Sequence, residues 1–370
     1  MKKLFFSLIC ILLSGCAAAE NTKNFGDLRT LRSMELRYAE QFGVDYLAGG
    51  YALITIANSG RFLVAPENLE PPLNIDKDIT VLRLPVKNIY LAATSAMCLF
   101  DALDGLEYIT MSSTKADGWY IENAKAAMES GNIVYAGKYS APDYELITAR
   151  NCGLAVFSTM IEHTPSVKEK LEDLGIPVLV ERSSYETHPL GRTEWIKLYG
   201  LLLGKDALAE ELFNEQAAYL DNISADNTGK TVAFFYISSS GNAVVRKNND
   251  YVAKMIELAG GNYAFTGLGN DSNTGSVNLN MEQFYSQTKD ADFIIYNSSI
   301  DGEISAVSEL LGKSKLLADF KAVKNGDVWC TSKNLFQETT EFGLMISDMR
   351  RIFTEDINGE DKLNFLFRLK

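Results

Sequence analysis

The chain has 370 residues, 46% of them apolar, and carries 48 acidic against 35 basic side chains, giving a formal net charge of −13. So acidic a chain excludes nucleic acid as the expected partner, because phosphates require patches of Lys and Arg. Beyond the first sixteen residues only Cys98, Cys152 and Cys330 remain, which allow one disulfide at most, so hydrophobic cores must hold the fold.

The first residues predict export and lipid attachment. Lys2 and Lys3 precede an apolar run, residues 4–13, that is shorter than the roughly 20 residues needed to span a bilayer and has the length of a signal-peptide core. Residues 13–16, Leu-Ser-Gly-Cys, resemble the lipobox of bacterial lipoproteins, with Cys16 as the lipidation site. An ordinary secretory cleavage near residues 17–19 is the alternative. We expect a signal peptide over residues 1–15 and an extracytoplasmic protein anchored to the cell membrane through Cys16.

Residues 16–50 are expected to form a lipidated tether and an N-terminal segment, followed by an α/β lobe over residues 51–190. A hairpin is predicted at 52–65, because Asn-Ser-Gly at 58–60 favours a turn between two strands. Strand-like and amphipathic helical runs then alternate, which is typical of βαβ units and a largely parallel sheet. The expected strands are 81–84, 89–92, 108–111, 133–136, 154–158 and 177–180, and the expected helices are 95–103, 121–129, 143–150 and 166–174.

The middle of the chain, residues 192–223, has apolar residues at three- and four-residue intervals and predicts one long helical stretch, interrupted at Gly204. We assign residues 191–225 to a helix between two lobes. Residues 226–370 then predict a second α/β lobe that ends in a closing helix. Its expected strands are 231–237, 293–296 and 328–331, and its expected helices are 251–259, 281–288, 304–311 and 338–353.

Several segments of residues 80–355 occur in the order and at the spacing of a known family. They are Gly-Arg-Thr-Glu-Trp-Ile-Lys at 191–197 with Gly-Lys at 204–205, Met-Ile-Glu-Leu-Ala-Gly-Gly at 255–261, and the stretches 292–296 and 318–329 before the final helix. The set resembles the binding proteins of iron–siderophore, haem and cobalamin importers. The resemblance implies two Rossmann-like α/β lobes with central sheets, bridged by one long α-helix and moving little on binding.

The same resemblance implies a function. A monomer would hand an iron chelate (a siderophore or haem) or a corrinoid to the permease and ATPase components of an ABC importer, without being an enzyme and with no metal or cofactor of its own. The family docks its importer through one surface glutamate in each lobe. Glu145, in a helix before strand 154–158, and Glu282, in a helix before strand 293–296, stand at the matching positions. The alternative for each is an exposed acid that merely favours a helix N-terminus.

A ligand is expected between the lobes, at loops that follow strands. The polar loop 183–192 supplies Tyr185, Glu186, His188 and Arg192. His188 either ligates a metal or only forms hydrogen bonds, and Arg192 either faces the cleft or is a cap or salt-bridge partner at the start of the helix. Aromatic and hydroxyl side chains elsewhere complete the set, because aromatic rings suit a planar or macrocyclic ligand. They are Trp119, Ser238, Ser239, Trp329 and Phe336, and the alternative for the aromatic residues is burial in a hydrophobic core.

Three other classes of function are alternatives to a solute-binding protein. A carrier of bare transition metal needs three or four His and carboxylate ligands, whereas this chain has only His163 and His188. A surface adhesin is disfavoured by the βα alternation and the lack of repeats. A lipid-anchored extracellular enzyme lacks the usual nucleophile, phosphate and zinc motifs, but a carboxylate-dependent hydrolase stays open, because its two acids have no fixed spacing.

Overall fold

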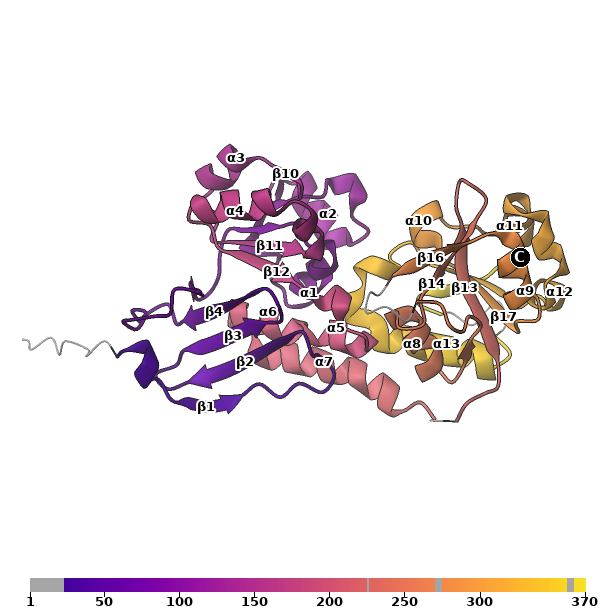
Figure 1. The fold of residues 1–370 in the computed structure, drawn as a ribbon, viewed down its shortest axis with the longest axis horizontal. Coiled ribbons are helices and arrows are strands. Elements are labelled where there is room, and N and C mark those ends of the chain that lie inside the picture. Colours follow the sequence, from indigo (N-terminus) through magenta and orange to yellow (C-terminus); the bar gives the residue numbers. More distant parts are fainter. Residues whose placement is uncertain (1–22, 225, 270–274, 358–362) are drawn as a thin grey trace, which may run out of the picture.

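The computed structural model describes residues 23–224, 226–269, 275–357 and 363–370, and its strands form three main sheets. Figure 1 shows one sheet at the lower left, a lobe above it, and a second lobe on the right, with helices between them. The predicted signal peptide and Cys16 lie outside the described residues. Among the described helices, none combines the length and the apolar character that crossing a membrane requires.

The first sheet has five strands in chain order and was only partly predicted. The hairpin at 52–65 is confirmed, with Asn58 taking the left-handed backbone that its turn needs (φ 54°). Residues 30–47, which were expected within the tether and N-terminal segment and for which no strands were predicted, add two antiparallel strands to that hairpin. The strands are β1 (Thr30–Ser33), β2 (Phe42–Leu47), β3 (Ala52–Ile56), β4 (Gly60–Ala65) and β5 (Ile79–Arg83).

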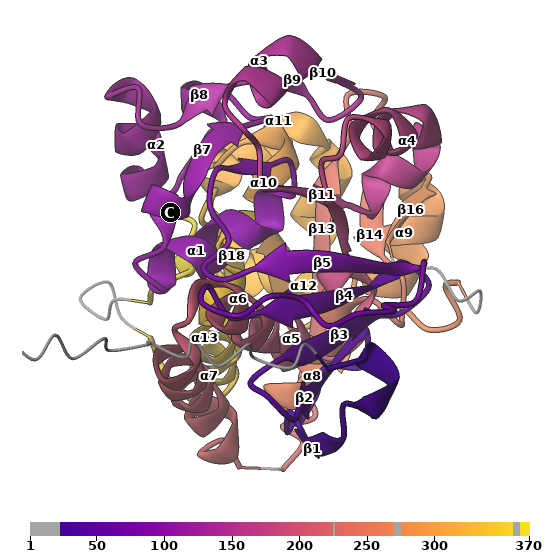
Figure 2. The same cartoon turned by 90° about the vertical axis from the view of Figure 1, so that its left-hand side faces the viewer.

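Lobe one is built on a parallel five-stranded sheet of order β12-β11-β6-β7-β8, as the βα alternation predicts. The strands are β6 (Ile89–Leu91), β7 (Ile109–Ser112), β8 (Val134–Tyr135), β11 (Leu154–Ser158) and β12 (Val178–Glu181). The helices are α1 (Met97–Ala102), α2 (Glu122–Glu129), α3 (Tyr144–Ala149) and α4 (Pro165–Asp173), and a small antiparallel pair joins β9 (Gly137–Lys138) to β10 (Ala141–Pro142). In Figure 2 this lobe stands above the first sheet.

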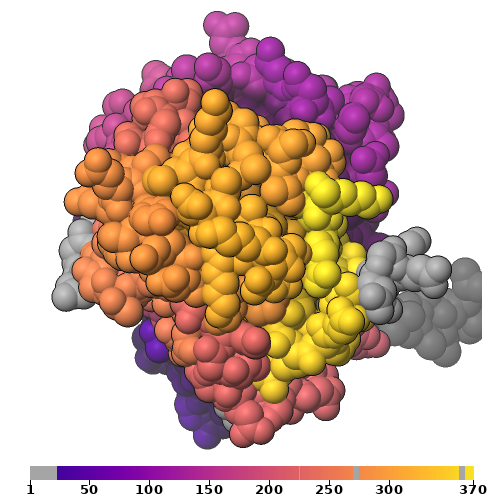
Figure 3. All heavy atoms as spheres, turned by 90° about the vertical axis from the view of Figure 1, so that its right-hand side faces the viewer, coloured from indigo at the N-terminus to yellow at the C-terminus, as the bar shows by residue number. Residues whose placement is uncertain are grey.

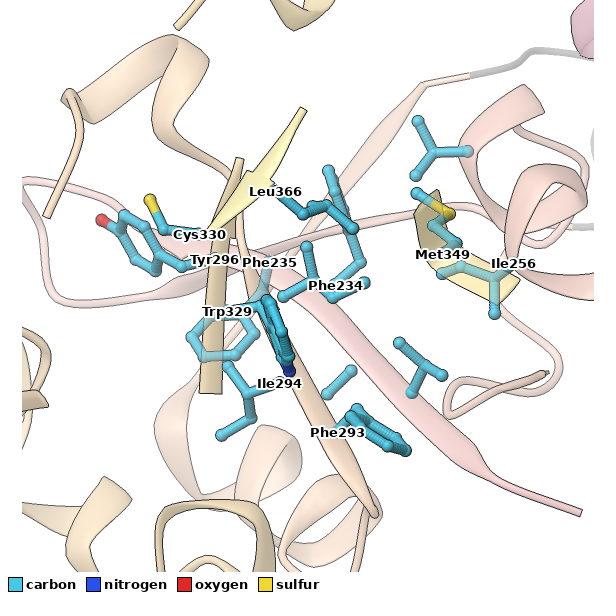
Figure 4. Packing of buried hydrophobic residues seen from close by; sticks show 14 of the residues in the cluster. Phe234, Phe235, Ile256, Phe293, Ile294, Tyr296, Trp329, Cys330, Met349 and Leu366 are labelled. Atoms are coloured by element: carbon cyan, nitrogen blue, oxygen red, sulfur yellow. The ribbon is translucent and has the colours of Figure 1, made fainter. Parts of the chain in front are cut away.

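Lobe two has a seven-stranded sheet of order β16-β14-β13-β17-β18-β19, with β15 beside β13. Its middle strands β13 (Thr231–Ile237), β17 (Phe293–Tyr296) and β18 (Val328–Thr331) are parallel and almost fully buried, which explains their continuous apolar sequence. Figure 4 shows side chains of these strands packed together in the core. The outer strands are β14 (Ala243–Arg246), β15 (Asn262–Tyr263), β16 (Ser276–Leu279) and β19 (Leu366–Arg368).

Helices cover lobe two, and Figure 3 shows its outer surface in orange with the C-terminal residues in yellow along one side. The helices are α8 (Tyr251–Leu258), α9 (Met281–Thr288), α10 (Ser298–Asp301), α11 (Val307–Lys313), α12 (Lys321–Asn325) and α13 (Phe342–Thr354).

The expected interlobe helix is present as three consecutive segments, α5 (Pro189–Glu194), α6 (Ile196–Leu203) and α7 (Asp206–Asp221). Gly204 ends α6 in the left-handed conformation (φ 70°), which glycine adopts without strain. The α6 segment is wholly buried with lobe one, whereas α7 packs against α13 of lobe two. The connection therefore has one part rooted in lobe one and one part that reaches lobe two.

Residues 35–41, between β1 and β2, cross the connecting helices and are called the strap below. The buried carboxylate of Glu194 accepts the backbone N–H groups of Arg37, Tyr38 and Ala39 at 2.8, 2.8 and 2.9 Å. The Arg37 guanidinium also pairs with Asp221 at the end of α7, at 3.2 Å. The first sheet is thereby fastened to both ends of the connection.

Candidate functional site

In both lobes, segments that follow the carboxyl ends of parallel strands meet at the boundary between the lobes. The 3-10 turn η2 (Thr94–Ala96) directly follows β6 of lobe one, and η8 (Leu335–Gln337) follows β18 of lobe two. These two turns pack together, and α1 also packs against η9 (Thr339–Glu341). Because open α/β sheets bind ligands outside the carboxyl ends of their strands, this boundary is the candidate site.

The lobe-one side of the boundary pairs a cation with an aromatic ring directly after β12. The guanidinium of Arg182 lies 4.3 Å from the ring centroid of Tyr185 and donates to Glu162 at 2.9 Å. Beside it, the Glu181 carboxylate is fully buried, accepting Ser183 N–H at 3.0 Å, and burial raises the pKa of Glu181. Tyr185, a predicted ligand residue, is half-buried at this edge.

The lobe-two side presents hydroxyl groups and a second cation–aromatic pair. Ser238 and Ser239 follow β13, and the Ser238 hydroxyl accepts the backbone N–H of Asn242 at 3.2 Å in a tight polar turn. Arg246 on β14 holds its guanidinium 4.9 Å from the ring centroid of Phe336, which follows β18. Since β13, β17 and β18 are parallel neighbours, the segments after β13 and β18 lie along one edge of the sheet.

Arg192 joins the two sides rather than capping a helix. Its guanidinium donates to the carbonyl oxygen of Ser184 at 2.7 Å in lobe one and lies 3.7 Å from the ring centroid of Tyr251 in lobe two. Burial lowers the pKa of Arg192, and the neighbouring Tyr251, Asp250 and Glu181 act against that effect. A cation held in this way fixes the two lobes to each other at the base of the boundary.

Glu186, predicted as a ligand residue, is turned away from the boundary. Its carboxylate is buried and accepts the backbone N–H groups of Glu40 and Gln41, each at 2.9 Å, and the indole N–H of Trp195 at 3.0 Å. Burial raises the pKa of Glu186, and these hydrogen bonds oppose the shift. The residue therefore anchors the strap, and its acceptor positions are occupied by the protein itself.

His188 caps a helix in this structure. Its Nδ1 accepts the backbone N–H of Leu190 at 3.2 Å, and its ring stacks on Tyr38 at 4.2 Å. An Nδ1 that accepts leaves the proton of the neutral ring on Nε2, so neither nitrogen offers a lone pair to a metal in this arrangement. Burial and the nearby Lys254 hold the pKa of His188 at about 4. The residue lines a pocket of about 320 Å³ that also includes Asn248.

Two predicted aromatic ligand residues belong to the cores instead. Trp119 is 3% exposed and packs in the core of lobe one, and Trp329 is 1% exposed in the core of lobe two. Figure 4 shows Trp329 among Phe234, Ile294 and other apolar side chains. Neither ring is presented to a ligand between the lobes, so the aromatic surface there comes from Tyr185 and Phe336.

The two predicted docking glutamates share one local geometry. Glu145 is exposed in the first turn of α3, whose N-cap Asp143 accepts the N–H of Leu146 at 3.0 Å. Glu282 is exposed in the first turn of α9, whose N-cap Asn280 accepts the N–H of Gln283 at 2.9 Å. Each carboxylate therefore stands near the positive end of a short capped helix, one in each lobe.

No metal site or disulfide is formed within the described part of the chain. No group of three or more His, Cys, Asp or Glu side chains there is arranged to hold a metal ion. Cys98, Cys152 and Cys330 are free and buried. Burial raises the pKa of Cys330 to about 11, which makes its thiol unreactive at neutral pH.

Arg246 and Gln337 are site residues that the sequence reasoning missed. Arg246 meets Phe336 from 90 positions away in the chain, and Gln337 bonds to residues more than 200 positions away. No local pattern in the sequence marks such pairs. The sequence marked these strand ends as ligand-binding candidates only through the hydroxyl residues after β13 and the aromatic residues in and after β18.

Comparison with known proteins places the fold. The sequence matches the family model described as periplasmic binding protein over residues 100–335. Two uncharacterized lipoproteins of Methanocaldococcus jannaschii are each 26% identical to this chain, over 94% and 100% of it and over 91% and 100% of their own length.

Solved structures agree with that match. The periplasmic haem-binding protein HutB of Vibrio cholerae has a TM-score of 0.58 at 16% identity, covering 70% of this chain and 97% of that one. A periplasmic binding protein of Veillonella parvula has a TM-score of 0.59 at 14% identity, covering 84% and 97%. IsdE of S. aureus, solved with haem, has a TM-score of 0.53 at 15% identity, covering 73% and 99%. The predicted fold class is confirmed.

Proposed function

The chain belongs to the periplasmic binding protein family, and on that premise we propose that it is a lipoprotein that binds an iron chelate or a corrinoid and delivers it to an ABC importer. The family and the structural neighbours are solute-binding proteins, and the relatives named above are lipoproteins. Lipidation of Cys16 would place the protein on the outer side of the cell membrane. Its role would be to capture cargo without transforming it.

One observation carries the proposal: two cation–aromatic pairs, Arg182 with Tyr185 and Arg246 with Phe336, at the facing sheet edges. Such pairs suit a ligand that combines flat unsaturated groups with negative charge, such as haem with its carboxylates or a chelate with catecholate rings. The net charge of −13 favours a neutral or cationic ligand, and the two arginines pair with Glu162 at 2.9 Å and Asp250 at 3.8 Å, so an anionic ligand would have to compete with these carboxylates.

Binding is tested with the chain from residue 17 onward, titrated with haem, a ferric siderophore and cyanocobalamin. Arg246→Gln should weaken binding of the preferred ligand by about 10- to 100-fold, since it removes one charged contact of about 1.5–3 kcal/mol. Arg368→Gln is the matched control, because Arg368 on β19 makes a similar pair with the core Trp329, at 4.8 Å, rather than with a residue of the candidate site. Flat titrations for all three ligands would refute the proposed ligand class.

The alternative of a hydrolase predicts a different result in the same experiment. A binding protein returns its ligand unchanged after release, whereas a carboxylate-dependent enzyme converts it with turnover. Recovered ligand analysed by mass spectrometry separates the two, and a product that accumulates in proportion to time would favour the enzyme.

Delivery and anchoring have their own tests. Changing Glu145 and Glu282 together to alanine should leave ligand affinity intact and abolish uptake in cells, because docking by paired charges needs both lobes. Unimpaired uptake would show that these glutamates do not dock the importer. Cys16→Ala should move the protein from the membrane fraction to the soluble fraction, since the lipid is its proposed anchor.

A further inference from the structure

Gln337 joins the two lobes through its side-chain amide. Its Oε1 accepts the backbone N–H of Tyr120 at 2.8 Å, and its Nε2 donates to the carbonyl oxygen of Gly118 at 2.9 Å. Gln337 is only 9% exposed, so water competes little for these bonds. The amide thus pairs with two backbone groups of lobe one, on either side of Trp119, much as a neighbouring strand would.

Other hydrogen bonds from the segment around Gln337 go to the connecting helices. Thr193 on α5 donates its hydroxyl to the carbonyl oxygen of Thr339 at 2.8 Å. Gln216 on α7 accepts the backbone N–H of Leu344 at 3.2 Å. These bonds join lobe two to the connection, which forms the pivot between the lobes. A rotation of the lobes about this connection can leave them in place.

The two Gln337 bonds reach lobe one itself, at the last residue of η4 (Ala116–Gly118) and at Tyr120 two residues further on, in the lobe whose α1 also packs against η9. Opening of the boundary must break them. We propose that Gln337 is a positioning residue that holds the lobes at the spacing seen here and so sets the width of the cleft before the ligand arrives. The statement about the cleft rests on the proposed function, whereas the statement about lobe spacing does not.

The expected size follows from ordinary amide hydrogen bonds. Each such bond changes an equilibrium by about 2- to 13-fold, so the loss of both should favour the open arrangement by about 5- to 150-fold. Gln337→Ala removes both bonds. Gln337→Glu keeps an acceptor for the Tyr120 N–H but has no donor for the Gly118 carbonyl oxygen, so its effect should be at least as large as the loss of one bond.

Lobe spacing is measured by pulsed electron paramagnetic resonance with spin labels at Glu129→Cys in lobe one and Lys315→Cys in lobe two, both exposed. In the chain from residue 17 onward the native cysteines are Cys98, Cys152 and Cys330, which are buried and should stay unlabelled. We expect one narrow distance distribution in the parent chain and an added longer-distance population in Gln337→Ala and Gln337→Glu. Gln287→Ala, at an exposed position of α9, is the control. Distributions that coincide with this control would overturn the proposal.

The ligand part is tested separately, by the dissociation rate of whichever ligand the parent chain binds. Gln337→Ala should release that ligand about 5- to 150-fold faster, while its thermal unfolding stays within a few degrees of the parent. Longer lobe distances with an unchanged dissociation rate would refute the role in cleft width. A parent chain that binds no ligand would refute the proposed function, and the distance measurement would still decide the role of Gln337 in lobe spacing.

Discussion

Replacing Glu194 should loosen the strap, because its carboxylate holds three of the strap's backbone N–H groups. The Glu194 carboxylate accepts three consecutive backbone N–H groups, those of Arg37, Tyr38 and Ala39, and lies 3.1 Å from Lys197 Nζ. Both members of the ion pair are buried, with side-chain exposures of 0% and 4%. Glu194→Gln keeps the shape of the side chain while removing its charge and one of its two acceptor oxygens.

The magnitude follows from those contacts. A hydrogen bond to a charged group contributes about 1.5–3 kcal/mol, and removing one member of a buried ion pair costs about 3–5 kcal/mol because the other charge stays buried. Because Lys197 keeps its contact with Glu210 after the change, we expect Glu194→Gln to cost about 3 kcal/mol, the lower end of that range. Glu210→Gln is the matched control, because Glu210 contacts the same lysine at the same 3.1 Å but is 54% exposed. Its replacement should cost under about 1 kcal/mol.

The assay is hydrogen exchange of the backbone amides of residues 37–39, supported by urea unfolding followed by circular dichroism. A loss of about 3 kcal/mol corresponds to exchange on the order of 100-fold faster. Exchange in Glu194→Gln within threefold of the parent chain would refute the reasoning. Equal acceleration by Glu210→Gln would also refute it, because burial would then not be the source of the effect.

Two further changes test the contacts between lobe two and the rest of the chain. Burial, with Glu341 nearby, raises the pKa of Glu338 to about 6. The folded chain holds the proton of Glu338 more tightly than the unfolded chain, so this contribution to stability is fully present below about pH 4.5 and is lost as the pH rises through about 6. Glu338→Gln should therefore abolish a decline of roughly 1–2 kcal/mol in the free energy of unfolding between pH 5 and 7, measured by urea unfolding. An unchanged pH profile would contradict this. Gly343→Ala would place a Cβ 2.1 Å from the carbonyl oxygen of Gln216 and should lower stability by about 1–3 kcal/mol, whereas Gly312→Ala, with open space around it, should be neutral or stabilising in the same thermal unfolding assay.

The central strands of both lobes could be predicted because burial on both faces leaves its mark in the sequence. The expected bounds of β13, β17 and β18 agree with the structure to the residue, since each is a continuous apolar run between turn-forming residues. Strand β1 could not be found in this way. All four of its residues are exposed, so it carries neither alternation nor an apolar run. It is a strand because β2 pairs with it, and pairing leaves little trace in one sequence.

The site residues were harder to predict, because a residue can contact a ligand only if its side chain points toward the site. That orientation is set by tertiary packing. Glu186 and Tyr185 are adjacent in one polar loop, yet the carboxylate turns inward to the strap and the phenol lies at the sheet edge under Arg182. Trp329 is of a residue type that often contacts flat ligands, but its side chain is buried in the core. The sequence located the loops correctly as the ends of parallel strands, but the rotation of each side chain depends on neighbours far away in the chain.

The strap and Gln337 both restrain movement of the lobes relative to each other. The strap joins the first sheet to both ends of the connection, through Glu194 on α5 and Asp221 on α7. Bending the connection would therefore pull on hydrogen bonds whose acceptors are buried, while opening the boundary would break the amide pair of Gln337. Because neither set involves a ligand, the lobes are held near one spacing in its absence. Ligand binding between the lobes would then cost little in ordering the protein.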